Sequence, residues 1–191
     1  DSFLHQRATN GPMARRPRDL ARLLDTMAGP DPRQPHGSLQ AASWPQITPG
    51  LSGARVGWLG NWGGAYAYED GIGEAAEAAL RQMEILGATV EEVPPPMDAG
   101  ALWEAWTTLR SWQVACSLAP LYETRRDDLK DTAIWEIERG LALSAMDVHR
   151  ASVIRSDWFK AAANLFARYD VLVLPTAQMW PYDVTLDWPR D

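Results

Sequence analysis

The sequence has few of the residues that build covalent or metal frameworks. It contains one cysteine, Cys116, and three histidines in 191 residues. A single cysteine excludes an internal disulfide framework, and neither a CxxC pair nor a metal-binding histidine spacing occurs. Because Val114, Ala115 and Leu118 surround Cys116, we expect its thiol to be a small buried apolar group on a helix face rather than a nucleophile.

Long apolar runs and an excess of positive charge are also missing. No apolar stretch approaches the ~20 residues that a membrane-spanning helix needs, and the first residues lack the pattern of a signal peptide. The net charge of −7 argues against nucleic acid and anionic membranes as partners. Apolar residues make up 46% and charged residues 23%, which is typical of a globular domain with a core. We expect a cytoplasmic protein.

Side chains that could act as nucleophile or base are also poorly placed. The two lysines, Lys130 and Lys160, lie in charged surroundings, whereas a lysine that acts as a base must be buried beside its nucleophile. The serines are scattered, and none lies in a Gly-x-Ser-x-Gly turn. These residues therefore predict no catalytic centre within the chain.

The order of predicted elements indicates an α/β fold. In residues 1–53, a helix begins at Pro17 and ends at Gly29 and Pro30, and a proline-rich connection follows. In residues 54–97, a strand at 55–59, a helix at 72–86 and a strand at 89–93 form a βαβ unit with parallel strands.

Residues 98–168 are predicted to be helical. Asp98 is placed to cap a helix that Pro120 ends near position 119, and shorter helical stretches follow at 127–142. Ser144 and Asp147 resemble a capping box at the start of a long helix that reaches position 168. In residues 169–191 a buried strand at 171–174 precedes a loop. The prediction is a three-layer α/β core with a helical excursion between its second and third strands.

A glycine-rich stretch at 60–64 allows a competing interpretation. It follows a strand and precedes a helix, and Glu91 ends the next strand, as in dinucleotide-binding units. Against this, bulky aromatic residues fill the place where phosphate would meet the backbone, and Asp70 near the helix start would repel phosphate. A nucleotide-binding module therefore stays open as a disfavoured alternative.

Tryptophan is the most over-represented residue type, with ten in the chain. Trp103 and Trp106 are three residues apart, hence on one side of a helix. Gln178 and Trp180 lie just beyond the strand at 171–174, and sites in α/β sheets gather at the carboxyl ends of strands. These four residues are candidates for lining the binding site of an apolar or aromatic substrate, with core packing as the alternative.

Four motifs follow one another along the chain. The first is the run Gly-Pro-Met-Ala-Arg at 11–15, followed by Asp19 and by Leu-Leu-Asp-Thr-Met-Ala-Gly-Pro at 23–30. Further stretches lie at 102–106, 135–140 and 169–177. In this order and spacing, the motifs together resemble the amidase signature family of serine hydrolases. The resemblance implies that Arg15 and Asp19 match an Arg and an Asp of the family pattern, for which we expect a structural ion pair. The local departure is Arg-Pro-Arg at 16–18.

The resemblance also implies function. The family cleaves carboxylic amides with a Ser–cis-Ser–Lys triad that precedes the Gly-Pro-Met-Ala-Arg run, and no position here matches that triad. We therefore expect the middle-to-late part of an amidase of α/β/α type with a mixed sheet, inactive alone and using no metal or organic cofactor. Its expected partners are an amide substrate and the remainder of the amidase fold, with a homodimer as an option. A non-catalytic amidotransferase-like subunit is the other alternative.

Overall fold

The computed structural model describes residues 11–33 and 50–186, in two compact units, residues 1–49 and residues 50–191. The first unit contains helix α1, Pro17–Met27. Pro17 occupies the first turn, where its missing N–H removes no helical hydrogen bond. The predicted helix is confirmed. Most of the predicted proline-rich connection, residues 34–49, lies outside the described residues.

The ion pair predicted in this unit has a different cationic partner. Asp19 Oδ2 accepts from Arg16 Nε at 3.1 Å, so the predicted pairing with Arg15 is wrong. Arg16 is the N-cap of α1 and has extended backbone angles. Arg15 therefore lies before the helix, and helical spacing does not bring it to Asp19.

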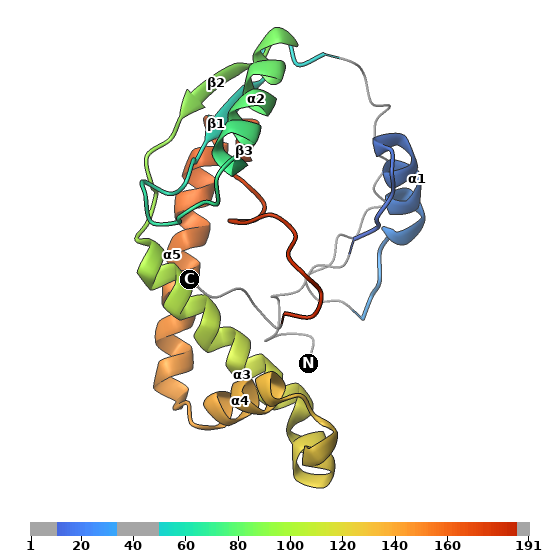
Figure 1. Cartoon of the computed structure of the whole chain (residues 1–191), viewed down its shortest axis with the longest axis vertical. Coiled ribbons are helices and arrows are strands. Elements are labelled where there is room, and N and C mark those ends of the chain that lie inside the picture. Colours follow the sequence, from blue (N-terminus) through green and yellow to red (C-terminus); the bar gives the residue numbers. More distant parts are fainter. Residues whose placement is uncertain (1–10, 34–49, 187–191) are drawn as a thin grey trace. The chain divides into compact units, whose positions relative to one another are not determined.

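The second unit is built on a three-stranded parallel sheet (Figure 1). Its elements are β1 (Arg55–Trp58), α2 (Ile72–Ile85), β2 (Thr89–Glu92) and β3 (Val171–Val173), with strand order β2-β1-β3. Position 56 of β1 pairs with Val90 and with Val171. The βαβ unit and the α/β class are confirmed. The three described strands are all parallel, so the mixed character of the sheet remains an expectation.

On one face of the sheet, Tyr169 and Leu172 pack against the glycine at position 57 of β1. The Tyr169 and Leu172 side chains lie over Gly57, where an added Cβ would be 2.8 Å from Leu172 Cδ2. Because side chains alternate along a strand, Val56 and its partner Val171 belong to the opposite face of the sheet. Val56 is buried but Val171 is 45% exposed. The expectation of a buried third strand is therefore wrong for this chain, because β3 is at the sheet edge and α2 contacts β2 instead.

The helical region between β2 and β3 contains four elements. They are α3 (Ala99–Arg125), the short 3₁₀ helix η1 (Arg126–Asp128), α4 (Asp131–Leu141) and α5 (Ala145–Phe166). Asp98 accepts a hydrogen bond from the Ala101 amide, which confirms the predicted cap. The capping box predicted for the long helix is also confirmed, since the side chain of Ser144 and that of Asp147 each bond the other's backbone N–H.

Helix α3 continues through Pro120 instead of ending there. A proline inside a helix removes one backbone hydrogen bond. The last turns are held by contacts with α4, in which the Tyr122 hydroxyl and Arg126 Nη2 both donate to Glu138 Oε1, at 2.8 and 3.0 Å. These tertiary contacts explain why the sequence signal for a helix end failed at this position.

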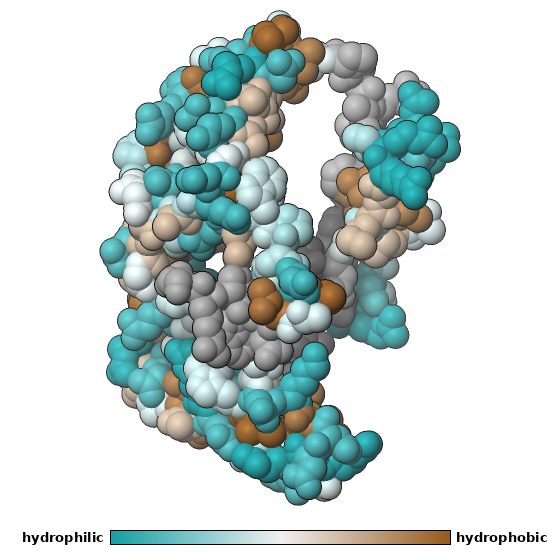
Figure 2. Space-filling view, in the orientation of Figure 1, coloured by the Kyte–Doolittle hydropathy of each residue, from teal (hydrophilic) through white to brown (hydrophobic). Residues whose placement is uncertain are grey.

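Helix α3 meets α4 at a close crossing of small residues. Ser111 and Ala115 face Gly140, so Cys116, one residue further round the helix, points outward. Its thiol is exposed, and the expectation of a buried Cys116 is wrong. Figure 2 shows that apolar and polar side chains are interspersed over the visible face of the molecule.

Candidate functional site

Two loops meet at the carboxyl end of the sheet. One follows β1 and spans residues 59–71, and the other follows β3 and spans residues 174–180. The first loop turns through Gly60, Gly63 and Gly64, whose φ angles of 55°, 67° and 90° suit glycine. The Tyr68 hydroxyl donates to the Gly60 carbonyl at 2.7 Å, which closes this loop on itself.

Gln178 and Trp180 fasten the second loop onto the first. Gln178 Nε2 donates to the Ala67 backbone carbonyl at 2.8 Å, and the Gln178 backbone carbonyl accepts from the Glu69 backbone N–H at 2.8 Å. The Trp180 amide donates to Glu69 Oε2 at 2.8 Å, and its indole Nε1 donates to the Asp70 carbonyl at 3.0 Å. We call these five residues the 178–180 clamp. Gln178 and Trp180 therefore lie beyond the carboxyl end of β3, as predicted.

The clamp leaves part of each side chain available. The Trp180 indole lies on Gly71, where an added Cβ would be 3.5 Å from the ring, and 45% of the residue is exposed. Gln178 uses its amide nitrogen within the clamp, and its amide oxygen has no described partner. The ring and the amide are therefore held in fixed positions, as a binding surface requires.

Trp103 and Trp106 form a separate group on α3. Their rings stack with centroids 5.2 Å apart and an interplanar angle of 25°. The Arg110 guanidinium lies 5.5 Å from the Trp106 ring and forms an ion pair with Glu136. The contacts described for this stack belong to α3 and α4, whereas those of the clamp belong to the sheet-edge loops. The structure thus forms two groups from the four predicted residues.

The glycine-rich loop does not provide a phosphate cradle in this structure. Trp62 lies in the middle of it, is buried, and donates from its indole to the Met97 carbonyl at 2.8 Å. Gly71, at the start of α2, is covered by Trp180. Glu91, the candidate ribose ligand, accepts from Arg55 at 2.8 Å and from the Tyr169 hydroxyl at 3.2 Å. This geometry argues against the nucleotide-binding alternative.

The cluster around Glu91 was not predicted from the sequence. The Arg55 guanidinium lies 5.3 Å from the Tyr169 ring, so Arg55, Glu91 and Tyr169 link β1, β2 and the segment that precedes β3. Hydrogen bonding from Arg55 lowers the pKa of Glu91, against the opposing effect of burial. Glu91 is 36 positions from Arg55 and 78 positions from Tyr169, and only the strand register brings the three residues together.

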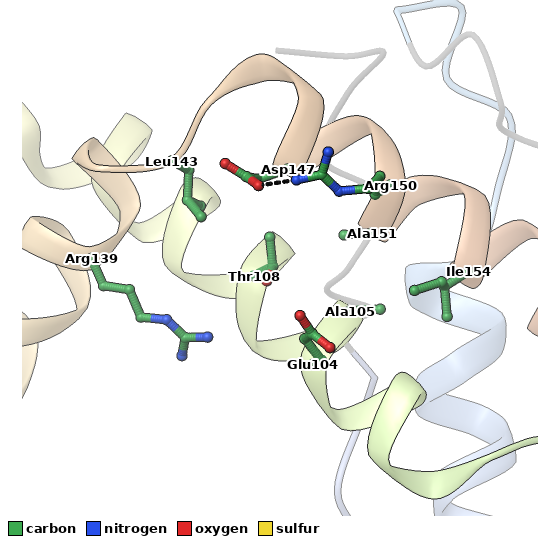
Figure 3. A pocket seen from close by; sticks show the side chains of 9 residues that line it. All are labelled: Glu104, Ala105, Thr108, Arg139, Leu143, Asp147, Arg150, Ala151 and Ile154. Carbon is green, nitrogen blue, oxygen red and sulfur yellow. Dashed lines mark hydrogen bonds and ion pairs between the residues drawn. The ribbon is translucent and has the colours of Figure 1, made fainter.

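A pocket among α3, α4 and α5 was also missed (Figure 3). It has a volume of about 430 Å³. Glu104 and Thr108 line it from α3, and Arg139 lines it from α4. The spacing of Glu104 and Thr108 puts them on one helix face, but the sequence does not show which helix packs opposite.

The other candidates for chemistry lie at the surface. Lys160 is exposed and forms an ion pair with Asp157 at 3.0 Å, and Lys130 is at the start of α4 without a described nucleophile beside it. Within residues 11–33 and 50–186, no three His, Cys, Asp or Glu side chains lie close enough together to hold a metal ion. No helix in the described part of the chain is long and apolar enough to cross a membrane.

Comparisons with known proteins agree with the arrangement of these elements. The chain is 30% identical over 172 residues to an acylamidase of Rhodococcus erythropolis, covering 88% of the chain and 36% of that protein. It is 31% identical over 196 residues to one subunit of the glutamyl-tRNA(Gln) amidotransferase of Thermus thermophilus, covering 87% of the chain and 40% of that protein. The chain therefore spans well under half the length of these relatives.

Solved structures show the same fold. A bacterial aryl acylamidase of the amidase signature family superposes with a TM-score of 0.82 at 24% identity, over 93% of this chain and 38% of that one. The family model called Amidase matches residues 2–186. The chain belongs to the amidase family, within the amidase signature enzymes.

Proposed function

We propose that this chain is part of an amidase that hydrolyses the C–N bond of carboxylic amides through a serine acyl-enzyme. The observation that carries the proposal is the family match across residues 2–186. In this reaction a serine Oγ attacks the amide carbonyl, the amine leaves with a proton, and water hydrolyses the resulting ester. Because no serine of this chain lies in a nucleophile motif, we assign the nucleophile and its lysine to polypeptide outside these residues.

In the proposal, the clamp contributes to substrate binding. The fixed indole of Trp180 forms one apolar wall, and the free amide oxygen of Gln178 accepts a hydrogen bond from the substrate amide N–H. Trp103 and Trp106 provide a second, separate apolar surface on α3. A pocket of this kind combines aromatic walls with a few fixed polar groups. The support is the position of the clamp at the carboxyl ends of β1 and β3, where sites of α/β folds lie.

We also infer the cofactor requirement, the cellular location and the partners of the protein. The reaction uses no metal and no organic cofactor, and the protein acts in the cytoplasm. Its partners are the amide substrate and the remainder of an amidase fold, with a homodimer as an option, and they include neither nucleic acid nor a membrane. The chain alone is inactive. Relatives that are themselves subunits, such as the Thermus thermophilus amidotransferase polypeptide, support the presence of partner polypeptide.

The test is hydrolysis of a panel of aryl and alkyl amides. We expect turnover by the complete polypeptide that carries these residues, and none by residues 1–191 alone. Treatment with an active-site serine inhibitor should abolish the turnover. Activity of the isolated chain that persists through further purification and resists the inhibitor would overturn the proposal, because it would require a nucleophile within these residues that is not an activated serine.

A non-catalytic amidotransferase-like subunit is the second candidate. The 31% identity to the Thermus thermophilus amidotransferase polypeptide is the observation that favours it. Under this alternative the complete polypeptide folds and binds a partner subunit but hydrolyses no amide on its own. The same amide panel, repeated with and without candidate partner subunits, distinguishes the two candidates.

A further inference from the structure

The pocket among α3, α4 and α5 shares no residue with the clamp or with the Trp103–Trp106 stack. Its walls come from the first half of α3, the end of α4 and the start of α5, whereas the clamp lies beside the sheet. Figure 3 shows Glu104 and Arg139 entering it from two different helices, with Thr108 between them. The volume of about 430 Å³ suits a small molecule.

The positive group of the pocket is held in place by neutral groups, and residues 11–33 and 50–186 provide no charged partner for it. Arg139 Nη2 donates to the Thr107 hydroxyl at 3.0 Å, and the guanidinium lies 5.6 Å from the Trp135 ring. Both partners are neutral. A guanidinium has five N–H donors, so most of the donors of Arg139 remain available to a carboxylate, which it can bind with two parallel hydrogen bonds.

The negative group of the pocket and the Thr108 hydroxyl have no partner in the described part of the chain. Among the described residues, neither a hydrogen bond nor an ion pair is found for the Glu104 carboxylate or the Thr108 hydroxyl. Thr108 is only 8% exposed as a residue, but its hydroxyl is not among the enclosed atoms without a partner, so it opens into the pocket. Glu104 is exposed, and its carboxylate is likewise accessible to a ligand. No ion pair joins Glu104 to Arg139, although both line the same described pocket.

The other two charged residues of the pocket neutralise each other. Asp147 forms an ion pair with Arg150, and its carboxylate also accepts from the Ser144 amide at 2.8 Å in the capping box. The remaining charge pattern is one cation and one anion on separate helices. The surface between them is aliphatic, from Ala105, Leu143, Ala151 and Ile154.

We propose that this pocket binds a small zwitterion of amino-acid size. Its carboxylate binds Arg139, its ammonium group binds Glu104, and Thr108 donates to the carboxylate. The methylene groups between the two charges contact the aliphatic surface. A simple anion would satisfy Arg139 but be repelled by Glu104, and a simple cation would meet the reverse problem. A metal ion would find only one carboxylate without a partner. This inference does not depend on the proposed amidase function.

The test is calorimetric titration of the complete polypeptide with four probes. β-Alanine and 4-aminobutyrate carry both charges, whereas propionate and propylamine carry one each. We expect at least one zwitterion to bind at least tenfold more tightly than either single-charge probe. Failure of both zwitterions to bind a protein that unfolds cooperatively would overturn the inference.

Three variants test the assignment. Glu104→Gln keeps the shape of the side chain and should weaken zwitterion binding at least tenfold without weakening propionate. Thr108→Val should weaken the zwitterion without lowering the melting temperature, which keeps the test valid if another variant fails to fold. Glu123→Gln, on the same helix but outside the pocket, is the matched control and should change nothing. Equal losses for zwitterion and propionate in Glu104→Gln would contradict the assigned role of Glu104.

Discussion

Gly140 of α4 packs directly on Ser111 of α3. A Cβ at position 140 would overlap the Ser111 carbonyl and lie 2.6 Å from the Ala115 Cβ. The overlap involves backbone, which cannot move without separating the helices. Ser111 is 1% exposed, and its hydroxyl has no hydrogen-bond partner among the described residues. The side chain is therefore enclosed at the contact between the two helices.

The first prediction follows from this crossing. Gly140→Ala should lower the free energy of unfolding by about 2–3 kcal/mol, because overpacking outweighs the gain in helix propensity. Gly73→Ala is the matched control, since position 73 lies inside α2 and an added Cβ would meet nothing within 4 Å. That variant should gain about 0.5–1 kcal/mol. Chemical denaturation of both variants measures the difference, and a neutral Gly140→Ala would show that the two helices do not touch at this position.

The second prediction concerns acid stability. Hydrogen bonding from Arg55 lowers the pKa of Glu91 below its ordinary 4.5. A carboxyl with a lowered folded-state pKa stabilises the fold above its unfolded pKa and loses that contribution as the pH falls through the folded one. Glu91→Gln should therefore lower the melting temperature at pH 7 and flatten its dependence on pH below about 4.5.

Glu92→Gln provides the comparison for this experiment. Glu92 is the exposed neighbour of Glu91 on β2, and among the described residues its carboxylate has no hydrogen-bond partner on another strand. The control variant should follow the wild-type pH profile. If Glu91→Gln also followed the wild-type pH profile, the ion pair and hydrogen bonds of Glu91 would not contribute to the stability of the fold.

The α/β class and most elements were predictable, because they rest on local signals. Pro17, Asp98, the Ser144–Asp147 box and the βαβ spacing are each read within a few residues. Two predictions that were wrong, the end of α3 and the burial of Cys116, depend on contacts between different helices. Contacts with α4 carry α3 through Pro120, and the Gly140 crossing decides that Ala115 rather than Cys116 is buried.

The candidate site also has one part with a local sequence signal and one part that depends on tertiary contacts. The position of Gln178 and Trp180 just beyond a strand end was predictable, but their role in binding stays a prediction. Their attachment to residues 67–71 depends on contacts between distant positions, such as the one that joins residues 111 positions apart. The pocket among α3, α4 and α5 depends on which faces of three helices meet. Neither relationship has a local sequence signal, so only the folded arrangement reveals them.

The third prediction tests the clamp as a substrate surface. In the complete polypeptide, Trp180→Ala and Gln178→Ala should each shift the ratio of kcat/KM values for two amides of different acyl size by about 1–3 kcal/mol. Trp180→Phe should preserve more of the preference, because it keeps an aromatic wall and removes the indole donor to Asp70. Melting temperatures are measured alongside. Unchanged ratios with a large fall in melting temperature would assign both residues to packing.

The fourth prediction concerns residues 1–191 expressed alone. Helix α5 carries apolar side chains that the chain leaves exposed, including Phe159 at 74%. β3 is also an edge strand with free backbone groups. We therefore expect self-association and binding of a hydrophobic dye, because exposed apolar surface of this kind drives association. Sedimentation that shows a compact monomer, together with a sharp unfolding transition and no dye binding, would mean that these residues form a self-sufficient domain.

The proposed serine nucleophile is tested most directly by labelling the complete polypeptide with a fluorophosphonate and mapping the labelled peptide. The probe forms a covalent bond with an activated serine, and its position identifies the nucleophile. We expect one labelled serine outside residues 1–191, with loss of amide hydrolysis in proportion to labelling. A labelled serine within residues 1–191, or full hydrolysis by a protein that takes up no label, would contradict this expectation.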